Sequence, residues 1–318
     1  MEWHVQDFPK ELIVKVNENY LRELAISIGG QRETARLLGV SFPSINAVIN
    51  GKKAISLRRL FKIINLSPQK EMFLKKLDEN LIAIKAPSSR AYWIKMKLPL
   101  KLTPELARII GHILGDGNIK ISSGRNVRYG SPDIVLLNSF IRDMLKVFGK
   151  VKYSIGEKRL MNCKFYEAEF PSVIGRILLH FFGPFGSHTG KIPKVIIKAN
   201  RKIKREVIKA LFDDEGSCVY KYSSYFGIVN KPLIIQVAKI LREFGIRVDI
   251  KTRKNKGFKK NLWFIFYLNG TNLRLFWKRI GLTENTKKWQ VFKDFFTTHY
   301  LKSNSNRTSL LDQNFKYS

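Results

Sequence analysis

Two nine-residue stretches of this chain, ninety-nine residues apart, end in the same way. Ile109–Gly117 and Ile208–Gly216 each run through apolar residues of helical character and close on an acidic residue followed by glycine. A device that occurs twice in one chain is typical of two like units that pack together. The repetition therefore predicts that the two acidic residues, Asp116 and Glu215, share one site.

Small residues in these stretches indicate how the two helices meet. Gly111 and Gly115 lie four positions apart, which places them on one helical face and leaves a groove without side chains. Ala210 occupies the position of the second stretch that matches Gly111. Small residues at this spacing allow two helix backbones to approach closely. We therefore expect the two helices to form an interface.

The ends of these helices are expected to bring the carboxylates of Asp116 and Glu215 together. Each is followed by a glycine, Gly117 or Gly216, which suits a left-handed cap at a helix C-terminus. A carboxylate there faces the negative end of the helix dipole, and two carboxylates also repel each other. The arrangement costs stability unless a cation compensates, and Mg²⁺ or another divalent ion such as Mn²⁺ suits such oxygen ligands. In a single copy, cap chemistry would explain the ending equally well.

The order of segments around the two stretches also repeats. Residues 103–190 and 191–301 each alternate apolar-periodic helices with β-rich runs. Each half predicts the order αββαββα, which gives the second part of the chain an α+β fold. Two such units are expected to pack on a pseudo-two-fold axis, with corresponding residues meeting at the centre.

The charge balance indicates the kind of partner. The chain of 318 residues has 58 Lys+Arg against 25 Asp+Glu, a net charge of +33 and a pI near 10.2. A surface this cationic favours a polyanion, and composition alone does not separate DNA from RNA. No apolar run reaches the ~18 residues of a membrane span, and no secretory signal opens the sequence. We expect a cytoplasmic, nucleoid-associated monomer with no membrane partner and no small-molecule substrate.

Cysteine usage excludes two classes of small domain. The only cysteines, Cys163 and Cys218, cannot build a disulfide framework or a zinc site with four cysteine ligands. We expect both to lie in or near the core.

The N-terminal part of the chain predicts a separate unit. Over residues 1–86, apolar positions three and four apart indicate short helices, and we expect a small all-α domain. Prolines and serines in residues 87–102 deny the chain a continuous helix and indicate a linker. Residues 302–318 are polar and poor in apolar side chains, so we expect a disordered tail.

Within the N-terminal unit, residues 31–51 have the spacing of a helix-turn-helix. Gly39 supplies the turn, and apolar residues hold the second helix against the first. Ser44, Asn46 and Asn50 then face outward and are candidates for DNA contact. The segment resembles the helix-turn-helix of the Cro and phage-repressor type. A helical hairpin that only packs or binds protein has similar spacing and stays an alternative.

A basic strand is predicted in the second half. In residues 247–253 the alternation places Arg247, Lys251 and Arg253 on one face and apolar residues on the other. The loop that follows, residues 254–260, is nearly all cationic. Such a hairpin suits phosphate contact and base reading in a major groove. The alternative is a solvated sheet edge that lysines protect from strand pairing.

The acidic-glycine endings, their spacing and the repeat order make residues 103–298 similar to the LAGLIDADG homing endonucleases of the double-motif kind. The resemblance implies two antiparallel sheets that form a saddle in the major groove of double-stranded DNA. It also implies metal ions between Asp116 and Glu215 and cleavage of both strands across the minor groove.

Three positions depart from the family motif. Leu114 stands where the name of the motif has an acidic residue, at a position that usually serves packing. Lys209 and Asp214 replace small residues in the second copy. Of these, Asp214 conflicts most with close helix packing.

The resemblance also points to lysines. Family members carry a basic residue shortly before the second motif, and here Lys191 occupies that place, with Lys288 as its partner in the second half. An ammonium near the scissile phosphate would stabilise developing charge or orient water. In a chain so rich in lysine, both are also explained as ordinary surface residues. The neighbouring His188 is interpreted as incidental.

The function that these observations favour is a metal-dependent, site-specific endonuclease that cuts double-stranded DNA. The chain ends lack the residues that protein splicing needs, so we expect a free-standing enzyme. Two alternatives stay open: a transcription regulator derived from a homing endonuclease, and an intron RNA maturase. The acidic pair argues against a pure regulator, because a binding surface gains nothing from carboxylates near phosphates.

Overall fold

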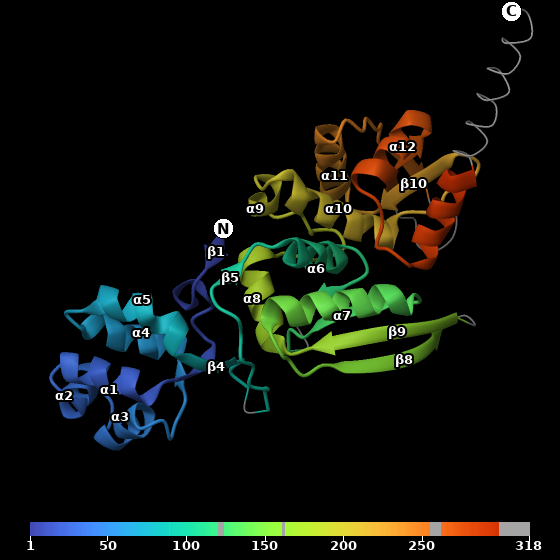
Figure 1. Ribbon diagram of the computed structural model, residues 1–318. Coiled ribbons are helices and arrows are strands. Elements are labelled where there is room, and N and C mark those ends of the chain that lie inside the picture. Colours follow the sequence, from blue (N-terminus) through green and yellow to red (C-terminus); the bar gives the residue numbers. More distant parts are fainter. Residues whose placement is uncertain (89, 120–123, 161–162, 255–261, 299–318) are drawn as a thin grey trace, which may run out of the picture.

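The computed structural model describes residues 1–88, 90–119, 124–160, 163–254 and 262–298 (Figure 1). The expected disordered tail, residues 302–318, and all but the first residue of the cationic loop 254–260 lie outside these ranges. The expected α+β class with antiparallel sheets is confirmed. Among the described residues, no helix is long and apolar enough to span a bilayer. Cys163 and Cys218 are both exposed, so the expectation that they are core residues was wrong.

The N-terminal unit contains helices and a small sheet. Its elements are β1 (Glu2–Trp3), the 3-10 helix η1 (Val5–Asp7), β2 (Ile13–Val16), α1 (Glu18–Ser27), α2 (Gln31–Leu38), α3 (Phe42–Ile49), β3 (Ile55–Ser56), α4 (Leu57–Leu66), α5 (Lys70–Asn80) and β4 (Leu81–Lys85). Within it, α2 and α3 form the expected helix-turn-helix, with Gly39 in the left-handed conformation at φ 65° between them. Ile45 and Val48 bury the inner face of α3.

The expectation of an all-α unit was wrong in one respect. Strands β3, β2 and β4 form an antiparallel sheet in that order, and Val14, Ile55 and Ile84 are buried in it. These strands are only two to five residues long. Runs this short leave no period-two pattern that stands out from the helical periodicity around them.

The first α+β half follows the expected order αββαββα. Its elements are α6 (Pro104–Leu114), β6 (Asn118–Ile119), β7 (Val127–Ser131), α7 (Ile134–Phe148), β8 (Ser154–Leu160), β9 (Cys163–Phe170) and α8 (Ser172–Phe182). The strands form one antiparallel sheet in the order β6-β7-β9-β8. Helices α7 and α8 cover its apolar face.

The second half departs from this order by one strand. Its elements are α9 (Lys194–Ile197), α10 (Arg201–Glu215), β10 (Ser223–Ile228), α11 (Lys231–Glu243), β11 (Lys251–Lys254), β12 (Leu262–Asn269) and α12 (Gly270–Arg279), and residues 287–298 are again helical. The described strands form a sheet in the order β10-β12-β11. Where the first half has β6, the second has an isolated bridge between Gly216 and Phe226. Lys221 and Tyr222 adopt positive φ, and the chain turns back too soon to form another strand.

The two halves meet at α6 and α10, which pack against each other at the centre of the molecule (Figure 1). A Cβ atom at Gly111 would lie 2.7 Å from the Cβ of Ala210 and 2.8 Å from the carbonyl oxygen of Val207. The predicted close approach at Gly111 and Ala210 is therefore confirmed.

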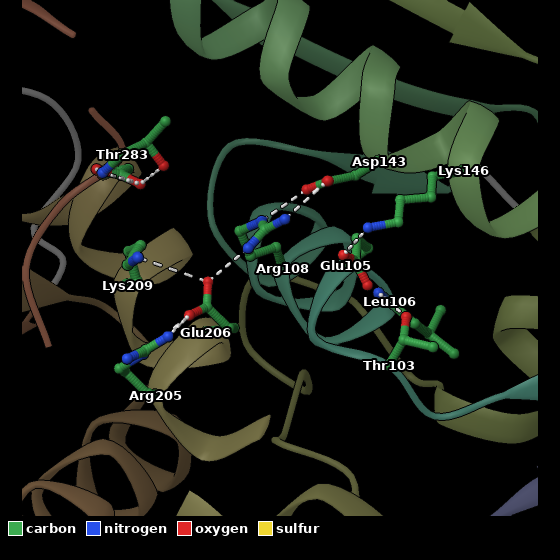
Figure 2. A network of polar contacts seen from close by, with 11 residues as sticks. Thr103, Glu105, Leu106, Arg108, Asp143, Lys146, Arg205, Glu206, Lys209 and Thr283 are labelled. Atoms are coloured by element: carbon green, nitrogen blue, oxygen red, sulfur yellow. Dashed lines mark hydrogen bonds and ion pairs between the residues drawn. The ribbon is translucent and has the colours of Figure 1, made fainter. Parts of the chain in front are cut away.

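A buried ionic network joins the same helices (Figure 2). Arg108 on α6 donates to both carboxylate oxygens of Asp143 on α7, at 2.7 and 2.8 Å. It also donates to Glu206 on α10 at 2.6 Å. Glu206 accepts a further bond from Arg205 at 2.9 Å, and Lys209 lies 3.6 Å from it. Lys209, which departs from the family motif, therefore contributes a partner to this network.

The start of the chain lies against the first half. Strand β1 pairs with β5 (Leu100–Lys101), and the ring of Trp3 contacts the ring of Phe182 on α8 edge-on at 5.1 Å. Glu11 forms ion pairs with Arg125 and Arg176 at 3.7 and 3.1 Å. These contacts join the N-terminal unit to the first half in one continuous core.

Candidate active site

Asp116 and Glu215 lie at the same end of the interface between α6 and α10. Helix α6 ends at Leu114, so Asp116 follows the helix by two residues, whereas Glu215 is the last residue of α10. Each of the two carboxylates lies within electrostatic reach of the Asp214 carboxylate, and Asp116 raises the pKa of Glu215. The structure thus brings the two acidic residues together as the duplication predicts.

The glycines that follow these residues serve close packing and not a left-handed cap, so that expectation was wrong. Neither Gly117 nor Gly216 has positive φ among the described glycines. A Cβ at Gly117 would lie 2.8 Å from the Cα of Ile113, and one at Gly216 would lie 2.7 Å from the carbonyl oxygen of Phe212. Both glycines are needed because the chain leaves each helix by folding back against its last turn.

The carboxylates of Asp116 and Glu215 are held in an unfavourable environment. Desolvation raises the pKa of Asp116 to about 6, with a further contribution from Asp214, although the residue keeps access to solvent. Desolvation raises the pKa of the half-buried Glu215 to about 7, with contributions from Asp116 and Asp214. Neither carboxylate accepts a hydrogen bond from any described residue. The charge of Lys288 offsets this environment only in part, because both pKa values stay raised.

The departure of Asp214 from the family motif suggested that this residue would disturb helix packing. In the structure it does not. Its carboxylate lies in the space left by Gly115, where a Cβ would lie 2.6 Å from Oδ2. It accepts hydrogen bonds from the Tyr129 hydroxyl at 2.7 Å and from His112 Nδ1 at 3.1 Å. The backbone N–H of Asp116 points to the same carboxylate at 3.4 Å. Sequence reasoning missed this network.

His112 and Tyr129 are buried beneath the acidic pair. Burial disfavours the protonated form of His112, but the nearby carboxylates, Asp214 first, outweigh it and raise the pKa. Burial and Asp214 raise the pKa of the Tyr129 hydroxyl well above its usual range. The pair therefore holds the Asp214 carboxylate through two side-chain contacts. The sequence signal that was available is a histidine on the helix face that also carries Gly111 and Gly115.

Asp213, the neighbour of Asp214 on α10, has a structural role. It accepts hydrogen bonds from the backbone N–H of Thr283 at 3.1 Å and from the Thr283 hydroxyl at 2.7 Å (Figure 2). Burial raises its pKa to about 6, against the opposing effect of His112 and Thr283. Asp213 thereby fixes the segment that leads from α12 to Lys288.

Lys288 reaches the end of α10. Its ammonium donates to the carbonyl oxygens of Phe212 at 2.9 Å, Asp213 at 2.7 Å and Gly216 at 2.5 Å. A cation at the C-terminal carbonyls of a helix offsets the negative end of the dipole. Burial lowers the pKa of Lys288, but its charge still lowers the pKa values of Asp116 and Glu215. All three N–H donors are occupied, so Lys288 holds the end of α10 in place.

Lys191 and His188 are exposed in the loop that follows α8. This loop abuts the end of α6, because a Cβ at Gly190 would lie 3.0 Å from a methyl carbon of Leu114. The Gly190 carbonyl also accepts a hydrogen bond from the Asn230 side chain at 2.8 Å. Lys191 is therefore placed beside the acidic end of the helix pair, with its side chain in solvent.

The donor set suits a hard divalent ion. Two carboxylates without hydrogen-bond donors, at the end of two helices, are ligands that Mg²⁺ or Mn²⁺ accepts. In the ranges that the structure describes, no group of three or more His, Cys, Asp or Glu side chains is arranged to hold a metal ion. The remaining ligands would then be backbone carbonyls, water and phosphate oxygens, which such ions take in proteins.

The second sheet offers an outer face of mixed character. Its cross-strand partners Tyr225 and Tyr267 are each 40% exposed, whereas the neighbouring Phe226 and Phe266 face the core. Strand β11 begins at Lys251, later than predicted, and its residues are all exposed. Lys251 and Arg253 pair with Ile265 and Trp263, on the face of the two tyrosines. Arg247 is exposed in the segment before the strand.

The outer face of the first sheet carries acidic residues as well. Glu169 pairs with Arg128 at 2.8 Å and Glu167 with Lys158 at 3.4 Å. These four side chains neutralise one another, so the two sheets present different charges outward.

The candidate DNA contacts of the helix-turn-helix lie along α3. Ser44, Asn46 and Asn50 are partly exposed. The Asn50 amide donates to Asn46 Oδ1 at 2.6 Å, and its oxygen accepts from Arg22 at 3.3 Å. This chain of contacts orders the polar face of the helix.

Two family models match separate parts of the chain. The model of the LAGLIDADG-like domain matches residues 202–281, which contain α10 and the second sheet. The helix-turn-helix model matches residues 22–66. These two segments are therefore similar to a LAGLIDADG-like domain and to a helix-turn-helix.

Curated relatives share only a small part of their own length with this chain. The chain is 27% identical over 187 residues to the replication factor C small subunit of Methanocaldococcus jannaschii, covering 58% of this chain and 10% of the relative. The glutamine–fructose-6-phosphate aminotransferase of the same organism is 24% identical over 85% of this chain and 24% of its own length. The tRNA-splicing ligase RtcB of Methanopyrus kandleri is 26% identical over 58% and 21%. The chain thus spans about a tenth to a quarter of these relatives.

Solved structures with partial likeness include homing endonucleases and a domain of another protein. The homing endonuclease I-WcaI bound to its DNA recognition sequence gives a TM-score of 0.43 at 14% identity, over 60% of this chain and 87% of that one. I-DmoI in complex with DNA and Mn gives 0.41 at 17%, over 57% and 98%. The N-terminal LAGLIDADG domain of DUF199/WhiA gives 0.43 at 13%, over 62% and 90%.

Proposed function

We propose that this chain is a metal-dependent, site-specific endonuclease that cuts double-stranded DNA. The observation that carries the proposal is the pairing of Asp116 and Glu215 at the end of α6 and α10, each with a raised pKa and without a hydrogen-bond donor in the described ranges. Holding two such carboxylates together costs stability. A divalent ion bound between them, beside a phosphodiester, would offset that cost.

In this proposal each half contributes one carboxylate to the hydrolysis of one phosphodiester in each strand. A bound Mg²⁺ or Mn²⁺ would supply an activated water and charge stabilisation at the leaving oxygen. Asp116 and Glu215 would hold the ion. Asp214 and Lys288 are positioning residues, because one fixes the backbone at Asp116 and the other fixes the end of α10.

The rest of the chain supports DNA as the substrate. A net charge of +33 favours a polyanion, and the outer face of the second sheet combines cations with tyrosines. The helix-turn-helix offers Ser44, Asn46 and Asn50 for a further contact with the duplex. In this proposal the protein acts as a monomer in the cytoplasm, on the nucleoid.

The names of the relatives do not point to one shared pathway. Their names describe a replication factor, an aminotransferase, an RNA polymerase subunit and a ligase, and the matched part is a small share of each. Similarity to proteins with such different names ties this chain to none of their named activities, which favours an activity of its own.

The test is incubation of the purified chain with Mg²⁺ and a library of double-stranded DNA drawn from the surroundings of its own gene. We expect cuts at one position in both strands, and no cuts when EDTA replaces Mg²⁺. Tight sequence-specific binding without cleavage would favour the transcription regulator instead. Preference for structured intron RNA would favour the maturase.

A further inference from the structure

A cavity of about 670 Å³ opens beside the first sheet, and its walls include none of the residues proposed for cleavage. These walls come from the segment after β4, from the loop before β8 and from the start of α8. The volume falls within the roughly 300–1,000 Å³ of pockets that hold small ligands. Part of the wall is apolar, contributed by Val151, Phe170 and Val173.

One end of the cavity is built for an anion. Helix α8 begins there, and no side chain caps its first N–H groups because Pro171 stands at the N-cap. One turn further, Arg176 donates one N–H to Glu11 at 3.1 Å, whereas its buried Nε has no partner in the described part of the chain. That Nε is closed off from solvent, so a ligand oxygen in the cavity would be bound by the terminal guanidinium N–H groups of Arg176 that Glu11 does not hold. Arg90 and Lys152 also line the cavity and add positive charge to it.

Aromatic side chains also line the cavity. Tyr92 is 59% exposed and Tyr153 is 41% exposed, and both line the cavity. The ring of Tyr153 stacks on Phe170 at 5.3 Å, and the Lys152 ammonium lies 5.8 Å from the centre of the Tyr92 ring. Exposed tyrosines held in this way offer planar surfaces for a nucleobase.

The acidic residue in the wall does not cancel this charge. Glu169 is held by Arg128 at 2.8 Å and by the Asn126 amide, so its carboxylate is already neutralised. Glu169 and its register partner Ser154 also belong to the outer face of the first sheet. The cavity therefore borders the outer face of the first sheet.

We propose that this cavity binds one nucleotide, with its phosphate at the start of α8 and Arg176, and its base against Tyr92 and Tyr153. The nucleotide could come from two sources: free in solution, or unpaired from a DNA strand that passes along the first sheet. The second source rests on the proposed DNA substrate, whereas the first does not. Neither requires that the protein cleaves DNA.

The experiment measures binding by calorimetry to the full chain without divalent ions. The titrants are dAMP, adenosine, inorganic phosphate and the tetranucleotide dT4. The pocket variant carries Tyr92→Ala and Arg90→Gln, two exposed positions whose replacement leaves the core intact. The control variant carries Tyr220→Ala and Lys198→Gln, which remove an exposed ring and an exposed charge elsewhere. Thermal unfolding checks that each variant is folded.

We expect the pocket variant to bind at least ten-fold more weakly than both wild type and control. Loss of affinity for dAMP would identify the free nucleotide as a ligand, and loss for dT4 alone would identify a nucleotide within DNA. Equal binding of inorganic phosphate and dAMP would overturn the proposal, because the base would then contribute nothing. Equal affinity of pocket and control variants for every titrant would overturn it as well. Cleavage is not measured, so failure here is separate from failure of the endonuclease assignment.

Discussion

The Asp214 carboxylate on α10 occupies the space beside Gly115, the C-cap residue of α6, because a Cβ atom at Gly115 would lie 2.6 Å from Asp214 Oδ2. The same carboxylate accepts hydrogen bonds from the Tyr129 hydroxyl and from His112 Nδ1. Close helix packing and the buried polar network beneath the acidic pair therefore depend on one another.

The helix interface should not tolerate a methyl group at Gly111. In Gly111→Ala the new Cβ would meet Ala210 and the Val207 carbonyl, so the helices must separate. We expect the free energy of unfolding, measured with denaturant, to fall by about 1–3 kcal/mol, as overpacking does in other cores. The control is Gly156→Ala on β8, where nothing lies within 4 Å of the added atom. Equal stability of the two variants would contradict the packing described for α6 and α10.

Stability should depend on pH and Mg²⁺ together. The pKa values of Asp116 and Glu215 rise to about 6 and about 7 in the folded chain, from roughly 4 in an unfolded one. Between pH 4 and pH 7 the folded state therefore binds more protons than the unfolded state. The stability that these two protonated carboxyl groups contribute is present at pH 4 and is lost as pH rises through 7. Mg²⁺ should therefore raise the thermal midpoint more at pH 8 than at pH 5.

The comparison for this measurement is Glu215→Gln, which removes one of the two titrating ligands. We expect its midpoint to respond to Mg²⁺ much less than that of wild type at pH 8. A response of the same size in both proteins would show that the ion binds elsewhere.

Lys288 and Lys191 should differ when each is replaced by methionine. Lys288→Met removes three hydrogen bonds to the end of α10 and a charge that lowers the pKa values of Asp116 and Glu215. We expect the pH profile of cleavage to move to higher pH, together with a loss of stability of about 1–3 kcal/mol. Lys191→Met, at an exposed position, should reduce the cleavage rate without moving the profile. A shifted profile in Lys191→Met would reverse the two roles.

The basic strand should contribute to binding through its cationic side chains. Replacing Arg247, Lys251 and Arg253 by glutamine should lower affinity for DNA and flatten its dependence on salt, by about 0.9 in the logarithmic slope for each phosphate that the variant no longer neutralises. The matched variant replaces the exposed Lys202, Lys239 and Lys278, which removes the same charge from α10, α11 and α12. If the slope falls equally in both variants, the strand acts only through net charge.

The sequence predicts those parts of the centre that depend on local spacing. Gly111 and Ala210 indicate a close helix contact because one residue in four faces the partner, and the structure has that contact. The network of His112, Tyr129 and Asp214 was not predictable in this way, because its members are 85 and 102 residues apart and no short pattern links them.

Other differences have equally specific causes. Lys288 was selected by alignment with Lys191, but its role at the end of α10 depends on the path of the chain after α12. In place of the strand that it lacks, the second half has a turn with positive φ at Lys221 and Tyr222. Lysine and tyrosine rarely adopt positive φ, so the sequence does not indicate this turn. The sheet of the N-terminal unit was not predicted because its strands are short.

The most direct test of the proposed function compares DNA binding and DNA cleavage in Asp116→Asn and Glu215→Gln. Both variants keep the shape of the side chain and remove its charge, at positions outside the buried network. We predict that each abolishes Mg²⁺-dependent cleavage of both strands while affinity for the same DNA stays equal to that of wild type or rises. Cleavage that persists in both variants would contradict the assignment of these two carboxylates as the catalytic pair.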